Sequence, residues 1–168
     1  RQMCIRDSSY TAHLLSGLCP QINKEESETI EKKKYSILIV ERDAVLRSYL
    51  TDILSSKFSV IAAKDGKGAL EIALRERISV ILTEIMIPII DGFELCRQLK
   101  SNPTTSNIPI IILSSRLSEK DKWKGMDSGA DLYIEKPFDS ALLIRQIQNL
   151  IRTLETQRMI SGKTLVPV

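Results

Sequence analysis

The sequence alternates short apolar runs with longer stretches whose apolar residues recur at helical spacing, five of each. The apolar runs are residues 37–40, 58–62, 80–82, 110–113 and 132–134. Nearly continuous apolar runs of this length are typical of strands buried on both faces of a parallel sheet. Parallel neighbours need crossover connections, which the intervening helical stretches supply. The pattern therefore predicts an α/β fold, a doubly wound five-stranded parallel sheet with five helices.

Residues that end helices mark the borders of the later predicted elements. Ser118 and Asp139 can accept hydrogen bonds from the first backbone amides of the fourth and fifth helical stretches. Gly129 suits the left-handed conformation that often follows the last turn of a helix. We therefore expect the fourth helix to run from Ser118 to Gly129 and the fifth to begin at Asp139.

The periodic pattern also divides the chain. Residues 1–35 have no sustained period and end in a charged run, so we predict a disordered leader or linker. The string QMCIRDS looks like a translated sequencing-library adapter, so part of this leader is expected to be non-native. A second interpretation takes residues 3–19 as the remnant of a preceding domain. Residues 36–153 are predicted to form one domain, and residues 154–168 a tail too short for a helix-turn-helix.

Charge and composition exclude several classes of function. Residues 36–153 hold 16 basic and 15 acidic side chains, so no basic stripe for nucleic acid is expected. No apolar run approaches the roughly 18 residues of a membrane span. Three cysteines and a single histidine, His13, indicate neither a disulfide framework nor a metal cluster. We therefore expect a cytoplasmic protein that binds neither nucleic acid nor membrane directly.

Polar residues follow four of the five predicted strands. They are Glu41-Arg42-Asp43 after the first, Glu84 after the third, Ser114-Ser115 after the fourth and Lys136-Pro137 after the fifth. The carboxyl ends of parallel strands lie at one edge of the sheet, where the strand order reverses and ligands bind. The sequence therefore predicts a functional site at this edge.

Three segments carry a family resemblance. EIMIPIIDGFELCRQLK, IPIIILSSR and GADLYIEKPF resemble the phosphoacceptor, switch and lysine segments of response-regulator receiver domains, and the likeness covers residues 36–153. More narrowly, the segments TSNIPIIILSSR, EKDKWKGMDSGADLYIEKPF and QIQNLIR are similar to receivers of one-chain hybrid two-component systems. Those systems fuse a sensor kinase, a receiver and an arabinose-regulator-type DNA-binding domain. The resemblance implies the flavodoxin-like receiver fold and a role in a phosphorelay.

The resemblance also implies roles for individual residues. It places the phosphoacceptor position at Glu84, the acidic pair at Glu41 and Arg42, the switch positions at Ser114 and Tyr133, and the family's lysine at Lys136. Ser114, Tyr133 and Lys136 keep the family's pattern. Arg42 and Glu84 depart from it, because the family has aspartate at the phosphoacceptor position and a second acid in the pair.

Both departures act against phosphorylation. The family uses Mg²⁺, which needs several oxygen ligands, and Arg42 replaces one with a fixed cation. At about 4 Å, two like charges repel by several kcal/mol at an effective dielectric near 20. Glu84 is one methylene longer than aspartate, and a misplacement of about 1 Å can cost on the order of a hundredfold in rate. We expect no bound metal or other cofactor, no catalytic residue and no enzymatic activity.

The sequence leaves several functional interpretations open. Arg42 and Lys136 are candidates to pair with Glu41 and Glu84 in place of a metal. Such pairing would hold the site in one state that resembles the activated one. In that state Ser114 and Tyr133 would be turned inward. The same charges would also fit a domain that has lost its signalling role, with these side chains forming an ordinary ion-pair cluster. Rival functions are an inefficient Mg²⁺-dependent phosphoacceptor and a flavodoxin-like small-molecule binder, although the phosphate loop of such binders is missing.

The expected activity is that of a pseudo-receiver, which signals by protein–protein interaction without phosphorylation. Its expected partners are a histidine kinase or other signalling domains. In this family they bind the face formed by the fourth helix, fifth strand and fifth helix. A homodimer is a further expected assembly.

Overall fold

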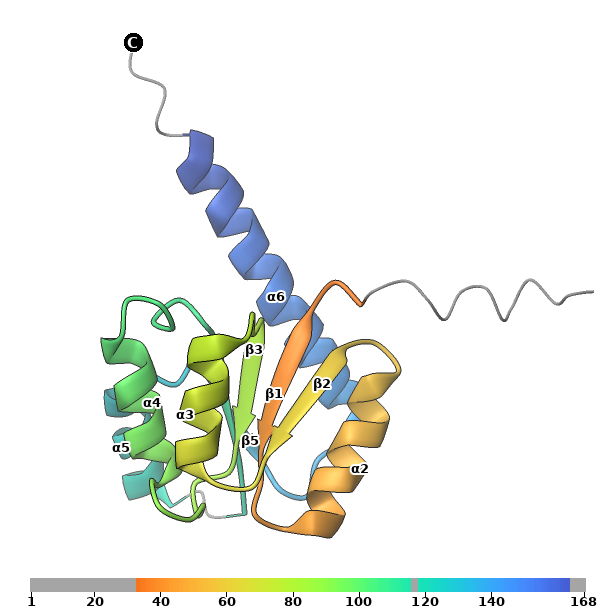
Figure 1. Ribbon diagram of the computed structural model, residues 1–168, viewed down its shortest axis with the longest axis vertical. Coiled ribbons are helices and arrows are strands. Elements are labelled where there is room, and N and C mark those ends of the chain that lie inside the picture. The colour runs from red at the N-terminus through yellow and green to blue at the C-terminus, as the bar shows by residue number, and fades with distance from the viewer. Residues whose placement is uncertain (1–32, 116–117, 164–168) are drawn as a thin grey trace, which may run out of the picture. The chain divides into compact units, whose positions relative to one another are not determined.

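The computed structural model describes residues 33–115 and 118–163 of the chain. The expectations made for residues 1–32 therefore lie outside the described residues. The strands are β1 (Ser36–Val40), β2 (Ser59–Ala63), β3 (Val80–Thr83), β4 (Ile110–Ser114) and β5 (Leu132–Glu135). The helices are α2 (Ala44–Ser55), α3 (Gly66–Arg75), α4 (Gly92–Ser101), α5 (Glu119–Ser128) and α6 (Ser140–Lys163). Within these residues, the predicted alternation of five strands and five helices is confirmed (Figure 1).

The five strands form one parallel sheet in the order β2-β1-β3-β4-β5. The chain moves from β1 outward to β2, returns to β3 on the other side of β1, and then continues to β4 and β5. The strand order therefore reverses between β1 and β3. At such a switch point the connections leave in opposite directions, and a crevice opens at the carboxyl edge.

Each face of the sheet is covered by helices, and strand side chains alternate between the two faces. On one face, Leu38 and Ile112 belong to a buried cluster that includes residues of α3 and α4. On the other, Ile39 and Ile111 belong to a second cluster with residues of α2 and α6. Figure 1 shows α3, α4 and α5 on one side, with α2 and α6 on the other. The nearly continuous apolar strands of the sequence follow from this double burial.

Side-chain caps begin the helices. Asp43 at α2 and Ser118 at α5 each accept a hydrogen bond from a backbone amide of the first turn. Asp139 accepts one from the Leu142 amide at 2.7 Å, next to the start of α6. Gly129 ends α5 in the left-handed region, with φ of 85°. The expected ends of the fourth and fifth helices at Ser118, Asp139 and Gly129 are confirmed.

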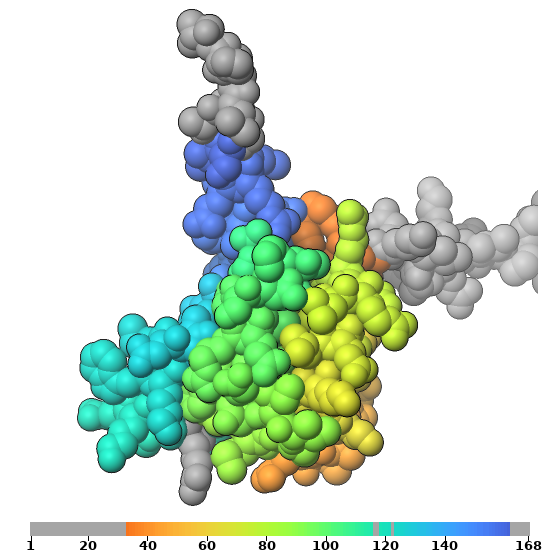
Figure 2. Space-filling view, turned by 60° about the vertical axis from the view of Figure 1, so that its left-hand side comes forward, coloured from red at the N-terminus to blue at the C-terminus, as the bar shows by residue number. Residues whose placement is uncertain are grey.

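The last helix is longer than the sequence pattern indicated. The expected boundary at residue 153 lies inside α6, which continues to Lys163. No proline or glycine interrupts residues 154–161, and Glu155 accepts a hydrogen bond from Tyr35 Oη at 2.5 Å. Figure 2 shows this part of the helix projecting beyond the rest of the domain. Residues 154–163 therefore belong to a helix, which corrects their assignment to a tail.

None of the helices in the described ranges combines the length and the apolar character needed to span a bilayer.

Candidate functional site

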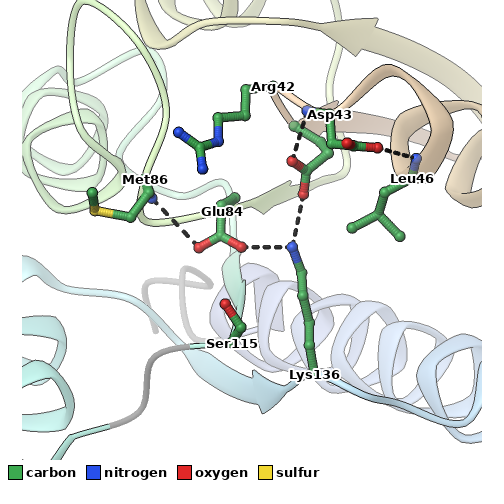
Figure 3. Close-up of a pocket in the computed structure, with 8 residues that line it drawn as sticks. Arg42, Asp43, Leu46, Glu84, Met86, Ser115 and Lys136 are labelled. Carbon is green, nitrogen blue, oxygen red and sulfur yellow. Dashed lines mark hydrogen bonds and ion pairs between the residues drawn. The ribbon is translucent and has the colours of Figure 1, made fainter.

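A pocket of about 400 Å³ lies at the carboxyl edge of the sheet, beside the switch point between β1 and β3 (Figure 3). Its lining comes from the β1–α2 turn, the segment after β3, the segment after β4 and the segment after β5. The lining residues are Glu41, Arg42, Asp43, Leu46, Glu84, Met86, Ser115 and Lys136. The predicted position of the site at this edge agrees with the structure.

Lys136 joins two carboxylates at the base of the pocket. Its Nζ atom lies 2.8 Å from Glu41 Oε2 and 2.5 Å from Glu84 Oε2. The side chain of Lys136 is 17% exposed, and those of Glu41 and Glu84 are 5% and 8% exposed. Two largely buried anions thus share one ammonium group through charge-assisted hydrogen bonds, which are stronger than bonds between neutral groups.

Glu84 has partners on both of its carboxylate oxygens. While Oε2 contacts Lys136, Oε1 accepts hydrogen bonds from Ser114 Oγ at 2.7 Å and from the Ile85 amide at 2.6 Å. The Met86 amide adds a longer contact at 3.4 Å. The carboxylate of Glu84 is therefore held by β4, by the segment after β5 and by its own backbone.

These contacts favour the charged form of both groups. Burial alone would raise the pKa of Glu84, but the hydrogen bonds from Lys136 and Ser114 hold this pKa below its ordinary value. For Lys136, burial alone would lower the pKa, and the bonds to Glu41 and Glu84 raise it above the ordinary value. The site therefore holds Lys136 as an ammonium ion and Glu84 as a carboxylate near neutral pH.

The β1–α2 turn fixes the other carboxylate. Glu41 Oε1 accepts a hydrogen bond from the Asp43 amide at 3.0 Å, while Oε2 contacts Lys136. The Asp43 carboxylate accepts from the Leu46 amide at 2.7 Å and so caps α2. Each of the two acidic side chains in this turn already has a structural partner.

Arg42 behaves differently from the expectation that it would share the ion pairs with Lys136. Its side chain is exposed and lines the pocket, and Figure 3 draws the guanidinium above Glu84. In residues 33–115 and 118–163, no ion pair joins Arg42 to a carboxylate within 4.0 Å. Lys136 reaches both acids from the base of the pocket, so two carboxylates share its single positive charge without an ion pair to the arginine.

Tyr133 lies outside the pocket lining. It belongs to β5, and its ring packs against the cluster beneath α3 and α4. The phenol oxygen is buried and makes no hydrogen bond of regular geometry in the described part of the chain, while Ser128, whose Oγ donates to the Gly125 carbonyl at 2.7 Å, lies close enough to lower the pKa of the phenol. Burial raises the pKa of Tyr133 to about 12. The sequence did not indicate the proximity of Tyr133 to Gly125, because it arises from the spacing of α5 over β5.

The structure thus brings Glu41, Glu84, Ser114 and Lys136 together, with Arg42 at the mouth of the pocket and Tyr133 apart. Sequence reasoning missed the backbone amides of residues 85 and 86 as donors to Glu84. No sequence signal identifies them, since every residue carries such a donor. Within the ranges that the structure describes, no three His, Cys, Asp or Glu side chains gather as a metal site.

The family comparison gives one clear match. A model of the response regulator receiver domain matches residues 37–148, which include each residue of the site described above.

Two curated proteins show the range of chains that carry a similar segment. Histidine kinase P4 of Formosa agariphila is 36% identical over 134 residues, which are 79% of this chain and 10% of that protein. Response regulator ArlR of Staphylococcus saprophyticus is 37% identical over 131 residues, 77% of this chain and 58% of that protein. The chain therefore matches a minor part of the first protein and just over half of the second.

A solved structure gives the same fold. The receiver domain of sensor histidine kinase PA1611 from Pseudomonas aeruginosa PAO1 superimposes with a TM-score of 0.66 at 30% identity. The match covers 70% of this chain and 97% of that one. That structure has a magnesium ion coordinated in its active-site cleft.

Proposed function

The chain belongs to the response regulator receiver domain family, and we propose that within this family it is a pseudo-receiver of a two-component system. In this proposal the domain signals through contacts with other proteins, and Glu84 is not phosphorylated. It has no enzymatic activity of its own.

The ion pairs of Lys136 carry the proposal. Its ammonium group lies within 2.8 Å of both Glu41 and Glu84, so one of the two negative charges that would attract a divalent cation is already balanced. Mg²⁺ requires near-octahedral coordination by oxygen atoms. Here one position of the acidic pair holds the guanidinium of Arg42, which offers no oxygen and repels a cation. We take this set of side chains as unsuited to Mg²⁺.

The contacts of Ser114 support a second part of the proposal, that the site stays in one arrangement. Ser114 donates to Glu84, which belongs to the chain and is always present. A phosphorylated receiver changes state when its phosphoryl group is added or removed, whereas this contact needs no such event. We propose that Glu84 holds Ser114 toward the pocket permanently. If the cluster is only a remnant of decay, breaking it will alter stability without altering partner binding.

The face formed by α5, β5 and α6 is the proposed contact surface. Trp123 and Met126 on α5 are 67% and 69% exposed, and Leu142 on α6 is 54% exposed. We propose a histidine kinase or another signalling domain as the partner, with a homodimer through the same face as a further assembly. The match to a segment of Histidine kinase P4 supports a hybrid architecture, in which that partner lies on the same chain. Direct binding of nucleic acid is not part of the proposal.

Incubation with acetyl phosphate and Mg²⁺, followed by intact-mass measurement, tests the absence of phosphorylation. We expect no phosphoryl adduct on the natural chain. The matched control is the double variant Arg42→Asp with Glu84→Asp, which restores an acid pair and the shorter acceptor and should gain one phosphoryl group. A stoichiometric adduct on the natural chain would overturn the proposal.

An inefficient phosphoacceptor receiver remains the second candidate. It is favoured by the contacts of Ser114 and Lys136 with the two oxygens of Glu84. The same experiment separates the two, because this candidate predicts a slow adduct that needs Mg²⁺ and disappears in Glu84→Gln.

A further inference from the structure

A second pocket, of about 700 Å³, opens at the amino edge of the sheet, at the other end of the strands from the pocket described above. Its lining includes Ser36, Ser79 and Ile108, which lie at or within two residues of the first residues of β1, β3 and β4. The projecting part of α6, which leaves the domain at this edge in Figure 1, adds Leu154 and Arg158. Known ligand pockets measure roughly 300–1,000 Å³, so this one has room for a short segment of another molecule.

The lining of this amino-edge pocket is mainly basic. Its charged residues are four basic ones, Lys34, Arg75, Arg77 and Arg158, and two acidic ones, Glu76 and Glu155. The carboxyl-edge pocket has the reverse balance, with two basic and three acidic lining residues. The two ends of the sheet thus differ in charge, although residues 36–153 are nearly neutral as a whole. No run in the sequence indicates this, because the basic residues come from the approach to β1, the end of α3 and α6.

Most of this positive charge has no counter-charge within the domain. Glu155 is already paired with Lys34, at 2.9 Å. In the described ranges 33–115 and 118–163, no ion pair within 4.0 Å joins Arg75, Arg77 or Arg158 to a carboxylate. All three arginine side chains are exposed. Because a guanidinium group can bind a carboxylate through two parallel hydrogen bonds, these side chains are suited to acidic groups from outside the domain.

Apolar side chains share the pocket with the arginines. They are Leu74, Ile78, Ile108 and Leu154. Leu74 is 44% exposed, so part of this apolar surface meets water. An inorganic anion would leave that surface uncovered, and single-stranded nucleic acid is bound by aromatic rings that stack on its bases. Tyr35 is the one aromatic residue among the described lining residues, and its hydroxyl contacts Glu155. A peptide with both carboxylates and apolar side chains would match both parts of the lining.

We propose that the amino-edge pocket is a docking site for an acidic segment of a partner protein. The carboxylates of that segment pair with the three arginines, and apolar side chains between the carboxylates cover Leu74 and Ile108. The inference goes beyond the proposed function, because the pocket lies at the other end of the strands from Glu84. Docking there does not depend on whether Glu84 carries a phosphoryl group.

Fluorescence anisotropy of a labelled peptide tests the proposal on the full chain. The probe is a peptide of repeated Glu-Glu-Leu units, and two matched peptides have glutamine in place of glutamate or serine in place of leucine. We expect the natural chain to bind the probe, to bind the serine peptide more weakly and to show no binding of the glutamine peptide. Binding of the probe should weaken as NaCl is raised, because salt screens pairs of exposed charges.

Changes of single arginines locate the binding site. Arg77→Glu and Arg158→Gln should each weaken binding of the probe about 10- to 100-fold, the range for a hydrogen bond between charged groups. The second change avoids placing another acid beside Glu155. Arg145→Glu is the matched control, because it reverses an exposed charge on α6 outside the pocket lining, and it should change binding by less than about twofold. Circular dichroism should be the same for all three variants, since each changed residue is exposed.

Nuclear magnetic resonance then maps the contact on the chain. The probe should shift the amide signals of residues 74–79 and 154–158 and leave those of residues 41–43 and 84–86 unchanged. The reverse pattern would place the peptide in the carboxyl-edge pocket and refute the proposal.

Three further results would count against the proposal. Equal binding of the glutamate and glutamine peptides would exclude the arginine contacts, and equal binding of the serine peptide would exclude the apolar ones. An equal loss in Arg145→Glu and Arg77→Glu would indicate attraction to overall charge. Tighter binding of a single-stranded DNA oligonucleotide or of phosphatidylserine vesicles, lost in Arg77→Glu, would assign the pocket to nucleic acid or lipid instead. A phosphoryl adduct on Glu84 would end the proposed function without affecting this test.

Discussion

Lys136 has the largest electrostatic role of any single residue in the site. Its ammonium group is the shared counter-charge of Glu41 and Glu84, whose side chains are 5% and 8% exposed. The three groups are interdependent, because removing the cation leaves two buried carboxylates without a counter-charge. Breaking a buried ion pair in this way is far more destabilising than never having formed it.

We predict that Lys136→Met lowers the free energy of unfolding by about 3–5 kcal/mol at pH 7. The control is Lys100→Met, which removes a more exposed pair with Asp131 at 2.9 Å and should cost about 1 kcal/mol or less. Urea unfolding of both variants measures the difference. A loss at position 136 no larger than that at position 100 would contradict a central role for the cation.

The pH dependence of this loss has a definite sign. In the natural chain the folded state lowers the pKa of Glu84. The Glu84 carboxylate therefore stabilises the domain at pH values above the unfolded-state pKa, and this contribution is lost as pH falls through the folded-state pKa. The pKa of Lys136 is raised, so its effect is lost only as pH rises through its folded value. In Lys136→Met, burial raises the pKa of Glu84, and protonation relieves the unpaired charge. We therefore expect the difference in the free energy of unfolding between the natural chain and Lys136→Met to be smaller at pH 5 than at pH 7.

Ile89 adopts an unfavourable backbone conformation in the segment between β3 and α4. Its φ is 72°, and its side chain is 74% exposed. A β-branched residue in the left-handed region carries roughly 1–2 kcal/mol of strain, and glycine there would lose about 0.5–1 kcal/mol through its greater unfolded-state freedom. We predict that Ile89→Gly stabilises the domain by about 0.5–1 kcal/mol in chemical denaturation. Val45→Asn, which also removes an exposed apolar side chain, should change stability by less than about 0.5 kcal/mol.

At the scale of elements, α6 has two parts with different support. Up to Ile151 it packs on the sheet through residues of the second buried cluster. Beyond that point Met159 and Ile160 are 70% and 62% exposed, and the support comes from Glu155, which accepts from Tyr35 Oη and pairs with Lys34. The segment that leads into β1 therefore anchors the projecting part of the last helix.

We predict that Tyr35→Phe loosens this projecting part without unfolding the domain. The phenol hydroxyl that contacts Glu155 would be lost, so the amides of residues 154–161 should exchange with deuterium severalfold faster. Exchange in β1 and β3 should stay unchanged. Tyr49→Phe, which removes a hydroxyl from a half-exposed ring on α2, is the control and should leave α6 unaffected. Equal protection of α6 in the two variants would show that the hydrogen bond from Tyr35 to Glu155 does not anchor it.

The sequence predicted where helices begin better than where the last one ends. Asp139 and Ser118 are local signals, because a capping side chain contacts the backbone three residues away. The end of α6 depends on Tyr35, which lies 120 residues from Glu155. A contact between such distant residues leaves no local pattern, and so the expected boundary at residue 153 was placed too early.

For the whole molecule, the order of apolar runs was enough to predict the parallel sheet and the edge that carries the site. The convergence of Glu41, Glu84, Ser114 and Lys136 followed, since each lies at or directly after the end of a strand. The sequence could not decide which cation would pair with the acids. That choice depends on where each side chain emerges: Lys136 reaches the buried carboxylates, while the exposed side chain of Arg42 lines the mouth of the pocket.

Binding of Mg²⁺ would show in the thermal stability of the whole domain. A ligand that binds only the folded state raises stability by about 2.7 kcal/mol when present at a hundred times its dissociation constant. We expect the melting temperature of the natural chain to be the same in MgCl₂ as in NaCl of equal ionic strength, because Arg42 replaces an oxygen ligand and Lys136 already contacts one carboxylate oxygen of each remaining acid. In Arg42→Asp, the added carboxylate lies beside two others, so a rise of several degrees is expected with Mg²⁺. Arg42→Asn, which removes the cation without adding a charge, should respond less. If the natural chain itself is stabilised by Mg²⁺ as strongly as Arg42→Asp, the lysine does not take the place of the metal, and the domain would have to be treated as a phosphorylatable receiver.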